Sequence, residues 1–251
     1  MISRLIALVL ISAAVLQAAP VRSPHVDAEL VPEVTSIKPG QPFTVALRLK
    51  MEQHWHTYWQ NPGDSGLATS IDWKLPEGFK AGPIQWPAPS RLPISTLVNY
   101  GYEGEVLLLT EITPPATLSA GTTVDLAARA DWLVCQEVCM PGGADLKATL
   151  PVTADAPKAD DKWKQAFAET RKNFPQKSDA WKVKAEHTAN GYKLTAEPVK
   201  PTAIWPGDDV YFFASEENVV EPSKPQTVSA NGAVHTVELS KSVSAQGKPE
   251  R

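Results

Sequence analysis

The chain has few cysteines, no excess of positive charge and, after its N-terminus, no long apolar run. Its 251 residues include only Cys135 and Cys139, so this pair is the one candidate for nucleophilic or redox chemistry. The formal net charge of −4 argues against nucleic acid as a partner. No later segment reaches the roughly 18 apolar residues that suggest a membrane span. No period of 20–50 residues is visible, which excludes tandem sequence repeats.

The N-terminus predicts export. Met1 to Arg4 is short and basic, and Leu5 to Ala19 is apolar and ends in small residues. This is the pattern of a secretory signal peptide over residues 1–19, and an uncleaved anchor is the alternative. The mature chain would then lie in a compartment where disulfides persist.

The two cysteines fall in the stretch from Trp132 to Gly142, with three residues between them. In a straight strand their Cα atoms would lie roughly 13 Å apart, whereas a disulfide needs about 4.4–6.8 Å. The chain must therefore turn between them if they pair, and one helical turn would suffice. A disulfide that closes so small a loop would add little stability to the fold, but it could serve as a reversible redox switch. A structural disulfide and a metal site remain alternatives.

The remaining pattern predicts an all-β protein, with an immunoglobulin-like β-sandwich over residues 24–154. Turn signals rich in Pro and Gly separate short runs, several of which alternate apolar and polar residues. The clearest runs are Val26–Val34, Phe43–Lys50, Thr69–Leu75, Val106–Ile112, Val124–Val134 and Ala144–Val152.

A linker over residues 155–179 and a second, incomplete β-rich module over 180–251 are expected to follow. Helical spacing predicts a short helix within 159–174 that links the domains or packs between them, with Asp160 or Asp161 at its N-cap. A solvated turn is the alternative. Strands are expected at Trp181–His187, Tyr192–Glu197, Val210–Ala214 and Val234–Leu239, and Asn190-Gly191 indicates a hairpin between the first two.

Two aromatic segments are further candidates. If the segment from His54 to Trp59 is a strand, His54, His56 and Tyr58 share one face. The histidines could bind a metal, stabilise a nearby thiolate, or lie in a half-buried strand with no chemistry. The segment 99–104 (Asn99, Tyr100, Gly101, Tyr102, Glu103 and Gly104) is predicted to be a loop that covers a reactive site or forms a simple turn.

Three motifs, at 54–66, 100–106 and 130–142, resemble the N-terminal periplasmic domain of the DsbD/ScsB thiol:disulfide interchange proteins, and most closely the ScsB-like branch. The resemblance implies a periplasmic protein-disulfide reductase with an immunoglobulin-like fold and no cofactor. Its implied partners are a DsbD-type membrane redox domain and thioredoxin-like periplasmic proteins, including those of cytochrome c biogenesis. Complete members add a membrane segment and a thioredoxin-like domain, so we expect a fragment, an isolated domain or a shortened relative, and a monomer.

The resemblance also implies roles for single residues. Cys139 matches the cysteine that forms mixed disulfides, and Cys135 matches its resolving mate. Asn99, Tyr100, Gly101 and Tyr102 match a cap loop over the pair, and His56 and Tyr58 face the active site. This chain departs from the DsbD pattern in having three residues between its cysteines and a histidine in place of a strand aromatic.

The expected exposure of the two thiols also favours Cys139 as the attacking cysteine and Cys135 as the resolving one. Met140-Pro141-Gly142 predicts a break in pairing just after Cys139, which would leave that thiol more reachable than Cys135. The competing hypothesis is a periplasmic copper-binding or structural module that uses Cys135, Cys139, His54 and His56, with Met140 as a further ligand.

Overall fold

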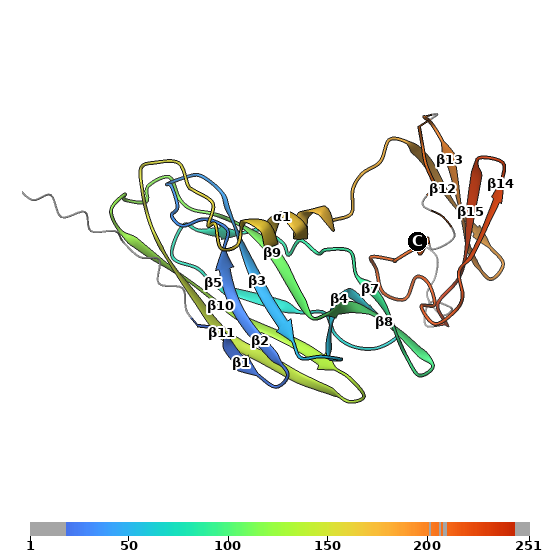
Figure 1. Cartoon of the computed structure of the whole chain (residues 1–251), viewed down its shortest axis with the longest axis horizontal. Coiled ribbons are helices and arrows are strands. Elements are labelled where there is room, and N and C mark those ends of the chain that lie inside the picture. Colours follow the sequence, from blue (N-terminus) through green and yellow to red (C-terminus); the bar gives the residue numbers. More distant parts are fainter. Residues whose placement is uncertain (1–18, 201, 206, 208–209, 244–251) are drawn as a thin grey trace, which may run out of the picture.

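The structure, a computed structural model, describes residues 19–200, 202–205, 207 and 210–243. Apart from Ala19, the predicted signal peptide lies outside these residues. The described residues form one helix and fifteen strands in three sheets (Figure 1). Their bounds are β1 (Val21–Ser23), β2 (Val26–Pro32), β3 (Phe43–Met51), β4 (His56–Gly63), β5 (Ser70–Lys74), β6 (Lys80–Ala81), β7 (Ser90–Ile94), β8 (Leu97–Glu103), β9 (Glu105–Thr113), β10 (Thr123–Cys135), β11 (Cys139–Pro151), α1 (Lys164–Lys172), β12 (Trp181–Thr188), β13 (Gly191–Pro198), β14 (Thr227–Asn231) and β15 (Val234–Ser240).

Two of the sheets form a β-sandwich of the immunoglobulin-like type. One has the order β1-β2-β3-β9-β6 and the other β11-β10-β4-β8-β7, with β5 also paired to β10. The inward residues alternate along each strand, as Val45, Leu47 and Leu49 do on β3, and meet those of β10 and β11 in one apolar core. All six strands predicted for this region are present. The sequence missed β1, β6, β7 and β8.

Helix α1 covers the outer face of the first sheet. Trp163 and Phe167 pack on Val31, Ala46, Leu107 and Leu109, which explains why β2, β3 and β9 each carry an apolar residue on this outer face. The predicted helix is therefore confirmed, but it packs against the sandwich and not between the domains. Its predicted N-cap was wrong. Trp163 holds that position without a side-chain hydrogen bond, and Asp160 instead accepts a hydrogen bond from the Lys162 backbone N–H in the preceding turn.

The third sheet has the order β12-β13-β15-β14 and lies at the far end of the molecule from β1 (Figure 1). The hairpin at Asn190-Gly191 is confirmed by the pairing of β12 with β13. The strand expected at 210–214 does not form. The Gln226 side chain accepts from the Phe212 N–H and donates to the Phe212 carbonyl, and so replaces a neighbouring strand.

Residues 210–216 instead reach the sandwich. Phe213 lies edge-on to Trp59 and Tyr100, with ring centroids 6.2 and 4.9 Å away. The Asn61 side-chain amide donates to the carbonyls of Ala214 and Glu216. This contact fixes the second module against β4 and β8, the two strands that continue toward the cysteine pair. None of the described helices is long and apolar enough to span a bilayer.

Candidate active site

The cysteine pair closes the tip of the longest hairpin. β10 and β11 pair without interruption from Thr123–Pro151 to Cys135–Cys139. Three residues, 136–138, make the turn, and the two cysteine Cα atoms lie 4.2 Å apart, joined by a disulfide. A hairpin turn, and not a helical turn, therefore brings the pair together.

The expected break after Cys139 was wrong. Pro141 pairs with Leu133, and β11 continues through it. Because β11 lies at the edge of its sheet, one of its sides has no neighbouring strand. A proline whose nitrogen faces that side removes no hydrogen bond from the sheet.

The two sulfurs differ in exposure. Cys135 lies between β11 and β4 and is only 2 % exposed, whereas Cys139 is exposed on the edge strand. The expected order of exposure is therefore confirmed, although for a different reason from the predicted break. An incoming disulfide can reach Cys139 directly and Cys135 only after rearrangement.

Four residues form one row across four strands. Glu103 on β8 pairs with His56 on β4, His56 pairs with Cys135 on β10, and Cys135 pairs with Cys139 on β11. Directly opposed residues in antiparallel strands place their side chains on the same face, with Cβ atoms about 4.5–5.5 Å apart. The register therefore aligns a carboxylate, an imidazole and both sulfurs.

Tyr58 lies beside this row and contacts the exposed sulfur. Its hydroxyl is 3.3 Å from Cys139 Sγ and accepts a hydrogen bond from the Asn99 amide at 3.5 Å. Ser65 donates in turn to the Asn99 side-chain oxygen. Burial raises the pKa of Tyr58 to about 12, so the phenol keeps its proton at neutral pH and can donate a hydrogen bond to a thiolate.

Gly66 makes room for this phenol. A Cβ at Gly66 would come within 2.2 Å of the Tyr58 ring, and the Gly66 φ of +111° is one that L side chains rarely adopt. The loop after β4 can therefore lie directly on Tyr58 only with glycine at this position.

His56 is buried against Tyr58 with ring centroids 5.2 Å apart, and its Nε2 atom has no hydrogen-bond partner. Burial lowers its pKa, and the charge of Glu103 opposes that shift. Its imidazole is therefore held mostly in the neutral, proton-accepting form. A hollow of about 370 Å³ lies beside it, lined by His54, His56, Arg91, Leu92, Pro93, Ile94, Glu103 and Gln136.

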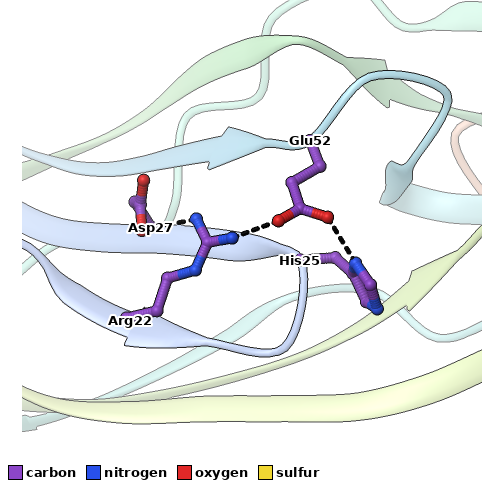
Figure 2. Close-up of polar contacts among 4 residues, drawn as sticks. All are labelled: Arg22, His25, Asp27 and Glu52. Carbon is purple, nitrogen blue, oxygen red and sulfur yellow. Dashed lines mark hydrogen bonds and ion pairs between the residues drawn. The ribbon is translucent and has the colours of Figure 1, made fainter.

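His54 does not share the strand face predicted for it. It lies in the turn before β4 with a φ of +70° and is exposed. Figure 2 shows the polar group next to this turn: the Glu52 carboxylate accepts from Arg22 and lies 2.5 Å from His25 Nδ1. The His25 ring stacks on Trp55 at 3.7 Å. These contacts fix the turn, so that β4 begins at His56.

The predicted cap loop was wrong as secondary structure, because its residues form β8. Tyr100 and Tyr102 are buried on the opposite face from His56 and Tyr58, where the Tyr102 hydroxyl donates to the Pro87 carbonyl. Gly101 pairs with Tyr58, and a Cβ there would lie 2.1 Å from the Thr57 carbonyl oxygen. Of the four residues, only the Asn99 side chain reaches the cysteine face.

Sequence reasoning missed Ser65, Gly66, Glu103 and Gln136 as neighbours of the site. Glu103 and Gln136 become visible only once the strand register is known. Among the described residues, no group of three or more His, Cys, Asp or Glu is arranged to hold a metal ion.

Comparison with known proteins gives the family. The N-terminal periplasmic domain of ScsB from Proteus mirabilis is 17% identical, with a TM-score of 0.61, and the match covers 86% of this chain and 81% of that one. The sporulation control protein Spo0M from Bacillus subtilis is 9% identical over 70% of this chain and 69% of that one, and its TM-score of 0.25 carries no argument. No curated protein matches the sequence.

The family described as thiol:disulfide interchange protein DsbD, N-terminal, matches residues 27–151, a range that contains the whole row from His56 to Cys139. At 17% identity the likeness to ScsB shows a shared fold. Together with the disulfide at the hairpin tip, the match shows that this chain belongs to the family of DsbD-type thiol:disulfide interchange N-terminal domains.

Proposed function

We propose that this chain is a periplasmic reductase domain that passes electrons through Cys135 and Cys139 to oxidised thioredoxin-like partners. The observation that carries the proposal is the asymmetry of the disulfide: one sulfur is exposed on an edge strand and the other is buried beside it. A relay needs one thiol that a partner can reach and a second that can displace it.

The reaction balances as a dithiol–disulfide exchange. The Cys139 thiolate attacks one sulfur of the partner disulfide, which breaks the partner S–S bond and releases one partner thiolate. The Cys135 thiolate then attacks Cys139 Sγ and releases the second partner sulfur. Two electrons pass to the partner, which becomes a dithiol and takes up two protons, while Cys135 and Cys139 become a disulfide.

Tyr58 supports the first step. Its protonated hydroxyl, 3.3 Å from Cys139 Sγ, can donate a hydrogen bond to the thiolate before attack and again when Cys139 leaves. The reductant for the next cycle would be a DsbD-type membrane redox domain, which the family relationship suggests.

Transfer to a purified partner tests the function. The reduced mature chain, freed of dithiothreitol and mixed with an equimolar oxidised thioredoxin-like protein, should lose two thiols while the partner gains two. Alkylation followed by mass spectrometry counts them on each protein. The double variant Cys135→Ser/Cys139→Ser is the matched control. If every thioredoxin-like protein tried stayed fully oxidised, that result would contradict a role as reductase.

A further inference from the structure

The His56 imidazole is a buried polar group without a partner. The residue is 4 % exposed, and its Nε2 atom has no hydrogen-bond partner. The large majority of buried side-chain polar atoms are hydrogen-bonded, so an orphaned one needs a reason.

The missing partner is present in the other redox state. His56 and Cys135 are direct cross-strand neighbours on one face of the sheet. In the disulfide, the Cys135 sulfur carries no proton and has none to donate. Reduction places a thiol proton on that sulfur, in the residue directly opposite His56 on the neighbouring strand.

We propose that His56 accepts the proton of the Cys135 thiol through Nε2 and so generates the thiolate that resolves the mixed disulfide. This inference rests on the proposed function and adds a third participant to it. Cys135 has little contact with solvent, so water is poorly placed to take its proton. The strand register supplies a base on the protein in place of water.

The proton and electrons can be followed through this step. The Cys135 S–H bond breaks and its proton moves to His56 Nε2, which leaves an imidazolium. The Cys135 thiolate attacks Cys139 Sγ, the new disulfide forms, and the partner thiolate leaves with the electron pair. The imidazolium then returns its proton to the departing thiolate or to water. Re-reduction of the disulfide runs the same transfer backward.

The charges around His56 fit an acceptor that is neutral at rest. Burial lowers the pKa of the imidazole, so the ring is neutral at rest and is free to accept a proton. Glu103, on the other side of His56 in the row, stabilises the imidazolium once it forms. Arg91 and His54 line the same hollow, where the Arg91 guanidinium opposes that charge, whereas Tyr58 presents a neutral phenol.

A two-phase reaction isolates the step without any protein partner. Reduced protein mixed with the aromatic disulfide 5,5′-dithiobis(2-nitrobenzoate) should release one coloured thiolate as Cys139 attacks and a second as Cys135 resolves. His56→Gln should slow the second release about tenfold or more at pH 7 and move its pH midpoint to higher pH. The first release should be unchanged.

Two matched variants separate proton transfer from packing. His56→Phe keeps an aromatic ring against Tyr58 but cannot accept a proton, and it should slow the second release as His56→Gln does. A normal second phase in His56→Phe would overturn the proposal in favour of packing. His54→Gln, in the same hollow but outside the row, should leave both phases and the pH midpoint unchanged.

The unsubstituted protein provides a second measurement. Ring ¹⁵N NMR of the full chain across pH should show that the His56 titration shifts when dithiothreitol reduces the disulfide, because reduction creates an ionisable thiol on the opposite strand. An identical His56 titration in both redox states would overturn the proposal even if the variants fold poorly. Failure to reduce thioredoxin-like partners would instead count against the proposed function alone, since neither of these assays contains one.

Discussion

A Cys135→Ser variant should accumulate a covalent complex with an oxidised thioredoxin-like partner, and a Cys139→Ser variant should not. Cys139 is exposed at the edge of the sheet, so it can still attack in the first variant, but no second thiol remains to release the partner. In the second variant the remaining thiol belongs to Cys135, which is 2 % exposed. The expected difference is close to all or none on a non-reducing gel.

Dithiothreitol should reduce the mixed disulfide and separate the two proteins, and mass spectrometry should place the intermolecular bond on Cys139. Glu137→Ala, in the same exposed turn, is the control and should behave like the unsubstituted chain. Trapping by Cys139→Ser alone would reverse the order of attack. Trapping by neither variant would favour the copper-binding or structural module.

The local pattern was sufficient for much of the sandwich. Alternation along 43–50 and the apolar run at 106–112 predict strands because each buries side chains at a period of two or on both faces. β1 and β6 are too short to show a pattern, and β7 contains Pro93, which normally argues against a strand. Their edge positions make those short or broken strands possible.

The segment at 99–104 shows where local reasoning ends. Glycine flanked by tyrosines suggests a mobile loop, yet Gly101 is required because β4 approaches within 2.1 Å of where its Cβ would lie. Long-range pairing decided the outcome, and sequence alone carries no register between strands forty residues apart. The row that aligns Glu103 with the cysteines is hidden for the same reason.

The strand predicted at 210–214 in the second module was wrong for a similar reason. Val210–Ala214 is a short apolar run typical of a strand, but Tyr211 and Phe213 pack on the sandwich, and Gln226 satisfies the backbone of Phe212. A sequence pattern can indicate that a segment is half-buried without indicating which surface buries it.

Gly66→Ala should both destabilise the domain and disturb Cys139. The new methyl group would meet the buried Tyr58 ring at 2.2 Å, in a backbone conformation strained for alanine. Overpacking and strain together should lower the free energy of unfolding by about 2–5 kcal/mol. A displaced Tyr58 hydroxyl would no longer reach the sulfur at 3.3 Å, so alkylation of reduced Cys139 at pH 7 should slow by about twofold to tenfold.

Gly207→Ala separates backbone strain from the clash. Gly207 has a similar φ of +105°, but a Cβ there would meet nothing within 4 Å. Its variant should lose only about 1–3 kcal/mol and leave the alkylation rate unchanged. Urea unfolding of the oxidised proteins and iodoacetamide kinetics of the reduced ones measure the two effects. Equal losses of stability and equal alkylation rates in both variants would mean that Gly66 serves only the backbone. The Tyr58 hydroxyl would then have no part in setting the reactivity of Cys139.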